Sequence, residues 1–287
     1  MNMKSKNRTI AVLMATYNGE EFIREQIDSL LSQTYTDWHL YVHDDGSKDA
    51  TKDIVTEYVC SHEGKISLLD YPAQGGACLN FISLMERVDA DYYMFCDQDD
   101  VWLPEKMEMS VRAMAEQEVC HSSKPIIVCT DMYVADEKLT VLHPSRSRFS
   151  ALYPQYIRTF DDCAPTAGVT GCTMLFNREA KDCCVFPVPE IAMHDRWLCL
   201  CVLKEKGILY GIDKPLMYYR QHGSNSLGAG SVAASSVGFL YRVKHLRCIV
   251  KRHVEHYSVL SLLGYGSVFK YIKHTLKYRK RIKEGHY

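Results

Sequence analysis

The chain has 287 residues, 47% of them hydrophobic, which is enough to bury a large core and excludes a chain disordered over most of its length. Its formal net charge of −1 conceals an asymmetry, because residues 239–287 hold 12 of the 34 lysines and arginines but only two of the 35 acidic residues. The remaining body is acidic, which argues against a main domain that binds nucleic acid.

Short apolar runs alternate with segments of helical periodicity along the first hundred residues. Residues 10–15, 39–43, 66–69 and 92–96 have the continuous apolar character of buried strands. The segments after the first three runs repeat apolar residues at helical spacing. This alternation predicts an α/β fold whose largely parallel sheet is covered by helices on both faces.

Polar turns follow three of these strands, with the letters TYNG at 16–19, DDGS at 44–47 and DQDD at 97–100. Because the carboxyl ends of neighbouring parallel strands meet at one sheet edge, we expect the three turns to form one site. Clustered carboxylates there suit Mg²⁺ or Mn²⁺ holding a diphosphate. Each turn taken singly is also compatible with an ordinary capped or solvated turn.

The character of the chain changes after Gly228. Residues 230–238 are small and polar, and the basic region beyond them repeats apolar residues at helical spacing with interleaved tyrosines, lysines and arginines. Such a region favours docking on an anionic membrane surface, and the alternative is a solvated, partly disordered tail. Nucleic-acid binding is not expected, because the base-stacking motifs of known modules are absent.

The 12 cysteines are scattered through apolar stretches without C-x-x-C spacing, which favours buried reduced thiols in a cytosolic protein. Neither Cys183-Cys184 nor the pair Cys199 and Cys201 matches a common zinc pattern. The apolar run at 10–15 is too short for a signal peptide, and no stretch reaches the length of a transmembrane helix. We therefore expect a cytoplasmic protein.

Taken in order, these motifs resemble the family 2 glycosyltransferases, and the D-Q-D-D-x-W and R-Q-H-x-x-N forms are most similar to the rhamnosyltransferase-like branch. The resemblance spans about residues 8 to 228. Its matching segments are ATYNG at 15–19, SLLSQT at 29–34, DDGSKD at 44–49, FCDQDDVW at 95–102, GCTMLFN at 171–177, HDRW at 194–197 and YRQHGSN at 219–225.

The resemblance implies roles for individual residues in donor binding. The nucleotide would be held by Thr16, Tyr17, Asn18, Asp45, Asn80 and Asp97. A divalent ion, Mg²⁺ or Mn²⁺, would be bound by Asp99, Asp97 and His222, and it would neutralise the departing diphosphate. Contacts to the acceptor, the donor sugar or the diphosphate would come from Asp100, Gly171, His194, Arg196, Trp197, Arg220 and Asn225.

Asp195 stands where inverting members of the family keep the carboxylate that takes the acceptor proton, so the resemblance implies that it is the catalytic base. The alternative is that Asp195 only caps the helix that carries Trp197. Arg196 occupies a position that is usually aromatic in the family, and it can instead pair with an anionic group of the acceptor.

The resemblance therefore implies a GT-A type, Rossmann-like nucleotide-sugar-binding domain with a mixed central sheet over residues 1–228. The charge and the helical spacing of the remaining residues predict a basic helical extension over residues 229–287. The expected protein is a metal-dependent inverting glycosyltransferase, peripheral on the inner face of the plasma membrane. It would move rhamnose or another hexose from a UDP- or dTDP-linked donor to a glycan or polyprenyl-linked acceptor in cell-surface polysaccharide biosynthesis. A catalytically silent nucleotide-sugar-binding scaffold is the alternative.

Overall fold

The first four strands form the parallel half of the sheet, and each lies within one residue of its predicted bounds at either end. The computed structural model describes residues 8–150, 153–166, 168–186, 193–223 and 246–284. Strands β1 and β4 are almost fully buried, as their continuous apolar runs require. The elements up to residue 120 are β1 (Ile10–Thr16), α1 (Ile23–Leu31), β2 (Trp38–Asp44), α2 (Thr51–Ser61), β3 (Ile66–Leu68), α3 (Ala77–Arg87), β4 (Tyr92–Cys96), β5 (Val101–Trp102) and α4 (Lys106–Cys120).

The second half makes the sheet mixed. Its strand order is β3-β2-β1-β4-β8-β6-β9-β5, with β8 antiparallel to both β4 and β6, while β9 runs parallel to β6. The remaining elements are β6 (Ile126–Ala135), β7 (Val141–His143), α5 (Arg146–Ser150), the 3₁₀ turns η1 (Pro154–Tyr156) and η2 (Gly171–Thr173), α6 (Phe160–Cys163), β8 (Met174–Asn177), α7 (Arg178–Asp182), α8 (His194–Lys204), β9 (Ile208–Arg220), α10 (Leu246–Leu262) and α11 (Val268–Glu284).

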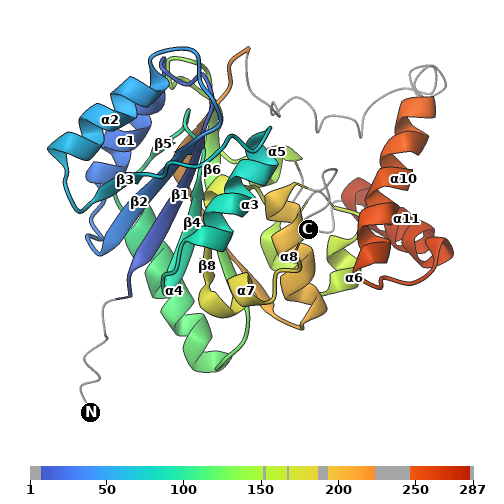
Figure 1. Cartoon of the computed structure of the whole chain (residues 1–287). Helices are drawn as coiled ribbons and strands as arrows, with labels where there is room; N and C mark the ends of the chain where they lie inside the picture. Colours follow the sequence, from blue (N-terminus) through green and yellow to red (C-terminus); the bar gives the residue numbers. More distant parts are fainter. Residues whose placement is uncertain (1–7, 151–152, 167, 187–192, 224–245, 285–287) are drawn as a thin grey trace.

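Helices cover both faces of the sheet, as the alternating pattern predicts (Figure 1). One apolar cluster joins the sheet to α1, α2 and α4, and includes Ile27, Val55 and Met107. The other joins the opposite face to α3 and α8, and includes Leu84 and Leu198. The carboxyl-terminal turns of the parallel strands are left uncovered between these layers.

The C-terminal region is helical, as expected for the extension. Helices α10 and α11 lie beside α6 and α8 at one end of the sheet (Figure 1), and Leu260, Leu263 and Tyr271 belong to the same core cluster as α8. The proposed boundary at residue 228 falls in a segment outside the described residues. Among the described helices, none combines the length and apolar character needed to cross a membrane.

The packing of α10 predicts that the C-terminal helices contribute to the stability of the body. Leu260 is fully buried, whereas Leu262 on the same helix is 66% exposed. We expect Leu260→Ala to lower the free energy of unfolding by about 2 to 5 kcal/mol because it leaves a cavity in the core, and Leu262→Ala to change it by less than about 0.5 kcal/mol. Urea unfolding of both variants measures this, and equal small effects would contradict the packing.

Candidate active site

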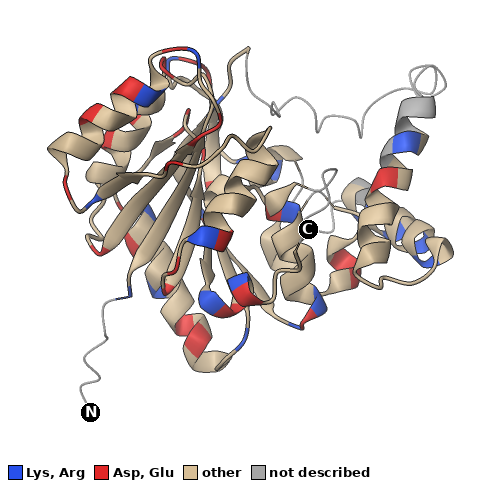
Figure 2. Ribbon diagram, in the orientation of Figure 1, with Lys and Arg blue, Asp and Glu red and all other residues tan. Residues whose placement is uncertain are grey.

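The turns after β1, β2 and β4 meet at one edge of the sheet. Thr16 at the end of β1 pairs with Asp44 of β2, and Met14 pairs with Cys96 at the end of β4. Figure 2 shows acidic residues in the loops at this edge. The first and last turns are also joined directly, because Gln98 donates to the carbonyl of Tyr17 and accepts from its N–H, both at 3.0 Å.

Gln98 is a positioning residue that the sequence motif did not reveal. A side chain at Gly19 would bring its Cβ within 2.3 Å of the Gln98 amide, which explains why a glycine stands there. The position of Gln98 within the DQDD turn was the signal available in the sequence, but its partner Tyr17 lies 81 residues away along the chain. By bonding to Tyr17, Gln98 fixes the position of the DQDD turn at residues 97–100, called the acidic loop below, relative to the TYNG turn at residues 16–19.

The TYNG turn presents one exposed aromatic ring. Thr16 is 1% exposed and its hydroxyl donates to Asp44 at 2.9 Å, so it holds the two turns together. Asn18, at a φ of 47°, accepts from the N–H of Lys48 at 2.9 Å. Tyr17 is 53% exposed, and its ring is the group of this turn that is open to a ligand.

Asp45 already has backbone partners. Its carboxylate accepts from the N–H groups of Gln74, Gly75 and Gly76, which precede α3. A carboxylate offers about four acceptor sites, so one position remains for a ring N–H of a nucleobase. The role expected for Asp45 thus becomes partly structural, because it also shapes the loop at residues 74–76.

The Asn80 side chain is buried and bonded to His43, and its expected contact with the nucleotide stays a prediction. It is 1% exposed, and both ends of its amide contact His43: Oδ1 lies 2.7 Å from the ring Nδ1 and Nδ2 donates to the backbone carbonyl at 3.1 Å. The His43 ring also stacks on Tyr71 with centroids 3.6 Å apart. Asn80 therefore orients His43 beneath the loop that Asp45 holds.

The three hydrogen bonds to Asp45 predict a measurable loss of stability in Asp45→Asn. The variant keeps the shape but removes the charge and one acceptor oxygen, and we expect the free energy of unfolding to fall by about 2 kcal/mol, since bonds to charged groups are strong. Asp70→Asn, at an exposed position of the same connection, is the control. Unfolding in urea without nucleotide measures both, and an unchanged Asp45→Asn would mean that Asp45 acts on ligand alone.

The acidic loop brings Asp99 and His222 together, as the resemblance implies for a metal site. The Nε2 atom of His222 lies 2.7 Å from Asp99 Oδ2, and both side chains are mostly buried. Asp100 is fully buried, with Oδ1 accepting from the N–H of Arg220 at 3.1 Å. The other oxygen, Oδ2, has no hydrogen-bond partner among the described residues.

The electrostatics of this loop fit a cation. Burial and the charge of Asp99 raise the pKa of Asp97 to about 7, and the same causes raise the pKa of Asp100 well above its usual range. Asp97 and Asp100 also lie with the Cys172 thiol in a group whose ligand atoms are within 4.8 Å of one another. Because burial raises the pKa of Cys172, the hard carboxylate oxygens are the ligands suited to Mg²⁺ or Mn²⁺.

Lys106 is a second residue that sequence reasoning missed. It is fully buried at the start of α4, donates to the carbonyl of Cys172, and its Nζ lies 3.5 Å from the centre of the Trp102 ring. Burial lowers its pKa to about 8, while the charges of Asp97 and Asp100 oppose that shift. A lysine on the buried face of α4, next to Met107, was the available signal.

Arg220 contacts the acidic loop through the Asp99 carbonyl, and its expected contact with the diphosphate stays a prediction. The side chain is 2% exposed, and its guanidinium donates to the Asp99 carbonyl at 2.8 Å and to Glu25 and the Glu137 carbonyl. It also lies over the Phe22 ring at 4.5 Å. With these partners Arg220 orients the loop that carries Asp99.

Asp195 lies in the first turn of α8 and faces the acidic loop. Its Oδ2 accepts from the N–H of Gly171 at 3.0 Å and its Oδ1 from the N–H of Arg196 at 2.6 Å. Burial raises its pKa to about 6 against these two hydrogen bonds, and the charge of Asp195 in turn raises the pKa of Asp97. A Cβ at Gly171 would lie 2.7 Å from His194 Nε2, so glycine allows this close approach.

The neighbours of Asp195 are buried, and their expected sugar or diphosphate contacts stay predictions. His194 lies between Phe81 and Phe95, and burial lowers its pKa to about 3. The guanidinium of Arg196 donates to the carbonyls of Ala164 and Thr166, and Trp197 is 1% exposed in the core. These buried side chains fix the first turn of α8, on which Asp195 lies. Asn225, the remaining expected contact, lies outside the described residues.

Comparison with solved structures identifies the type of fold. Residues covering 95% of this chain match 72% of Staphylococcus aureus TarS 1-349 in complex with UDP-GlcNAc, with a TM-score of 0.60 and 16% identity. The mannosyltransferase PcManGT from Pyrobaculum calidifontis, in complex with GDP-Man and Mn²⁺, matches 97% of this chain with 81% of its own, at a TM-score of 0.56 and 14% identity. The GT-A type fold expected from the sequence is confirmed.

Sequence comparison identifies the family. The chain is 31% identical over 229 residues to the dTDP-rhamnosyl transferase RfbG of Shigella flexneri, covering 75% of this chain and 74% of that protein. It is 26% identical to the UDP-Glc:alpha-D-GlcNAc-diphosphoundecaprenol beta-1,3-glucosyltransferase WfgD of Escherichia coli, over 69% of this chain and 71% of that one. The model of glycosyl transferase family 2 matches residues 11–184. This chain is therefore a glycosyltransferase of family 2, similar to the rhamnosyltransferases within it.

Proposed function

We propose that the enzyme is a metal-dependent, inverting hexosyltransferase that transfers rhamnose or another hexose from a UDP- or dTDP-linked donor to a glycan or polyprenyl-linked acceptor of a cell-surface polysaccharide. One observation carries the proposal. The Asp195 carboxylate accepts from the backbone N–H of Gly171, and the next residue, Cys172, has its thiol within 4.8 Å of carboxylate oxygens of Asp97 and Asp100, so the expected base and the acidic loop are joined through two consecutive residues. The similarity to RfbG supports a deoxyhexose donor.

The donor would lie along the turns that Gln98 joins. The exposed ring of Tyr17 can stack on the nucleobase, while the remaining acceptor position of Asp45 can take its ring N–H. Uracil and thymine both offer that N–H, so Asp45 admits either base. The diphosphate would then extend toward the acidic loop at Asp97 and Asp99.

The acidic loop would hold Mg²⁺ or Mn²⁺ through Asp99 and His222, with Asp97 close by. The Oδ2 of Asp100, which has no hydrogen-bond partner among the described residues, and the raised pKa values of Asp97 and Asp100, caused by burial and by the charge of Asp99, support a bound cation. When bound, such an ion supplies Lewis-acid stabilisation of the diphosphate leaving group. Arg220 and Gln98 orient the loop, and Asp195 accepts the proton of the acceptor hydroxyl as the new bond forms at the anomeric carbon.

The base role predicts a selective loss of transfer in Asp195→Asn. We expect the rate of transfer to fall about a hundred- to ten-thousand-fold, because proton abstraction is lost, while the donor affinity measured by calorimetry stays within about threefold. For the wild type, transfer should fall as the pH drops below about 6, since Asp195 must be deprotonated to accept a proton. Unchanged transfer by Asp195→Asn would remove Asp195 from this role.

The cation proposal predicts a loss of metal response in Asp99→Asn. Mn²⁺ should raise the thermal midpoint of the wild type in the presence of a nucleoside diphosphate, because binding to the folded state stabilises it, and chelation should abolish transfer. Asp99→Asn should lose most of the shift, whereas Asp53→Asn, exposed on α2, should keep it. An equal shift in both variants would rule out Asp99 as a ligand.

The C-terminal helices support attachment to an anionic membrane surface on the cytoplasmic side. Leu262, Phe269, Ile272 and Leu276 are each about half exposed or more. Basic side chains follow both helices (Figure 2). This combination of exposed apolar and basic groups is typical of helices that lie at a bilayer surface. It would place the active site beside acceptors carried on a membrane lipid.

Membrane attachment predicts that Phe269→Asp weakens binding to vesicles containing phosphatidylglycerol by more than about tenfold, since it puts a carboxylate into the apolar contact. Val119→Asp is the matched control, because both side chains are 79% exposed but Val119 lies on α4. Vesicle sedimentation at two salt concentrations measures the affinities. Equal binding by both variants would contradict attachment through α11.

A further inference from the structure

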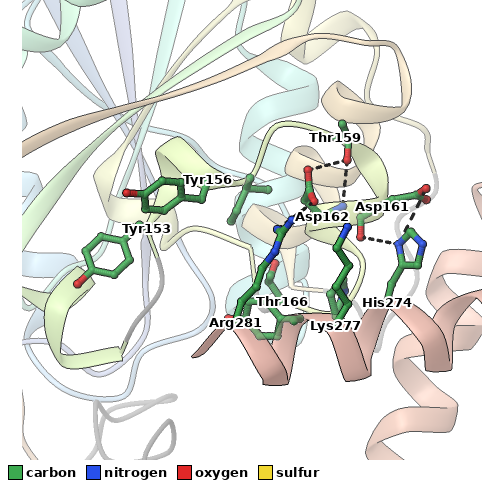
Figure 3. A pocket seen from close by; sticks show the side chains of 12 residues that line it. Tyr153, Tyr156, Thr159, Asp161, Asp162, Thr166, His274, Lys277 and Arg281 are labelled. Atoms are coloured by element: carbon green, nitrogen blue, oxygen red, sulfur yellow. Dashed lines mark hydrogen bonds and ion pairs between the residues drawn. The ribbon is translucent and has the colours of Figure 1, made fainter. Parts of the chain in front are cut away.

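A cavity lies outside the acidic loop, and none of residues 97–100 lines it. It has a volume of about 270 Å³, is partly open to solvent, and lies between residues 153–166 and helix α11 (Figure 3). One wall carries Tyr153, Tyr156 and Thr159, and the opposite wall carries basic side chains of α11 (Figure 3). Since pockets for drug-sized ligands begin at about 300 Å³, this volume suits a ligand about the size of one sugar residue.

Helix α11 presents two different faces. Lys270, His274, Lys277 and Arg281 follow one another at intervals of four, three and four residues, which places them on one face, and the last three line the cavity. Phe269, Ile272 and Leu276 are exposed on another face. One helix therefore supplies both the surface proposed to meet the membrane and a wall of the cavity.

The charges of the cavity are unequal. Asp161 pairs with Lys270 at 2.5 Å, and Asp162 lies 3.7 Å from Arg281. Lys277 is exposed, and no carboxylate oxygen among the described residues lies within 4.0 Å of its Nζ. Both carboxylates thus have cationic partners. The Lys277 ammonium group and the N–H groups of Arg281 that do not face Asp162 can therefore bind an anionic ligand.

The opposite wall has groups that suit a sugar ring. The rings of Tyr153 and Tyr156 lie 5.9 Å apart at 76°, and Tyr156 is 40% exposed. Such rings offer an apolar face for the C–H groups of a sugar, while Thr159 and the carboxylates can exchange hydrogen bonds with its hydroxyls.

The segment that lines the cavity at Thr166 leads on to Gly171, whose N–H donates to Asp195, the proposed base. Thr166 lines the cavity, and its carbonyl accepts from Arg196 Nε at 3.1 Å. Gly168 packs against the backbone of Arg196, where a Cβ would meet its Cα at 3.2 Å. Gly171, three residues on, donates to Asp195. A ligand in the cavity therefore lies against the segment that positions Asp195.

We propose that this cavity is an acceptor subsite for a sugar residue that carries a phosphate or diphosphate. The sugar ring lies against Tyr153 and Tyr156, and the phosphate oxygens bind Lys277 and Arg281. The inference rests on the proposed transfer function, and it specifies the acceptor class of that function as a phosphorylated saccharide.

Calorimetry with short-chain alkyl hexosyl and N-acetylhexosaminyl diphosphates, and with alkyl glycosides of the same sugars lacking phosphate, tests the subsite in the full-length protein. We expect the wild type to bind at least one diphosphate about tenfold more tightly than its phosphate-free partner. Lys277→Ala and Tyr156→Ala should each weaken that binding about tenfold. Lys273→Ala, which removes the same charge from α11 outside the cavity, should bind normally.

Three further results separate the possible outcomes. Release of nucleoside diphosphate from the donor without acceptor tests the proposed function itself, and it should be the same in all four proteins. Equal acceptor binding by Lys277→Ala, or an equal loss in Lys273→Ala, would overturn the subsite while leaving that function intact. Phosphatidylglycerol vesicles that compete fully with the sugar diphosphate at Lys277 would identify a lipid headgroup site and also overturn it.

Discussion

The close packing of Asp97, Asp99 and Asp100 after a buried strand is the constraint on which the site depends. Burial and mutual repulsion raise the pKa of Asp97 and of Asp100, so the folded loop needs positive charge nearby. The chain supplies part of it from Lys106 within the core and from Arg220 beneath the loop. A divalent cation would supply the rest, and this is why a donor diphosphate and its ion can bind at the end of β4.

The same edge of the sheet orders the other parts of the site. Gln98 ties the nucleotide turn to the acidic loop, and Gly171 ties the segment after the 153–166 region to Asp195. Asp195, the proposed base, is therefore held by backbone N–H groups rather than by long side chains, and burial raises its pKa to about 6.

The sequence predicted the parallel strands, the meeting of their polar turns, the family and the helical C-terminal region, because each depends on local periodicity or on motifs with fixed spacing. It did not predict which side chain within a motif faces the ligand. Asn80, Arg220 and Trp197 stand in matching motifs, yet their side chains turn inward to His43, the Asp99 carbonyl and the core. Gln98 and Lys106 were missed because their partners are distant in the chain.

The most direct test of the account is the release of nucleoside diphosphate by purified protein from a panel of UDP- and dTDP-linked sugars, with Mn²⁺, with Mg²⁺ and with chelator. The account predicts that one donor both stabilises the protein and is slowly hydrolysed, that both effects require the ion, and that Asp195→Asn retains the stabilisation alone. Stabilisation by a donor without any release, even after lipid-linked acceptors are added, would contradict a catalytic role for this site.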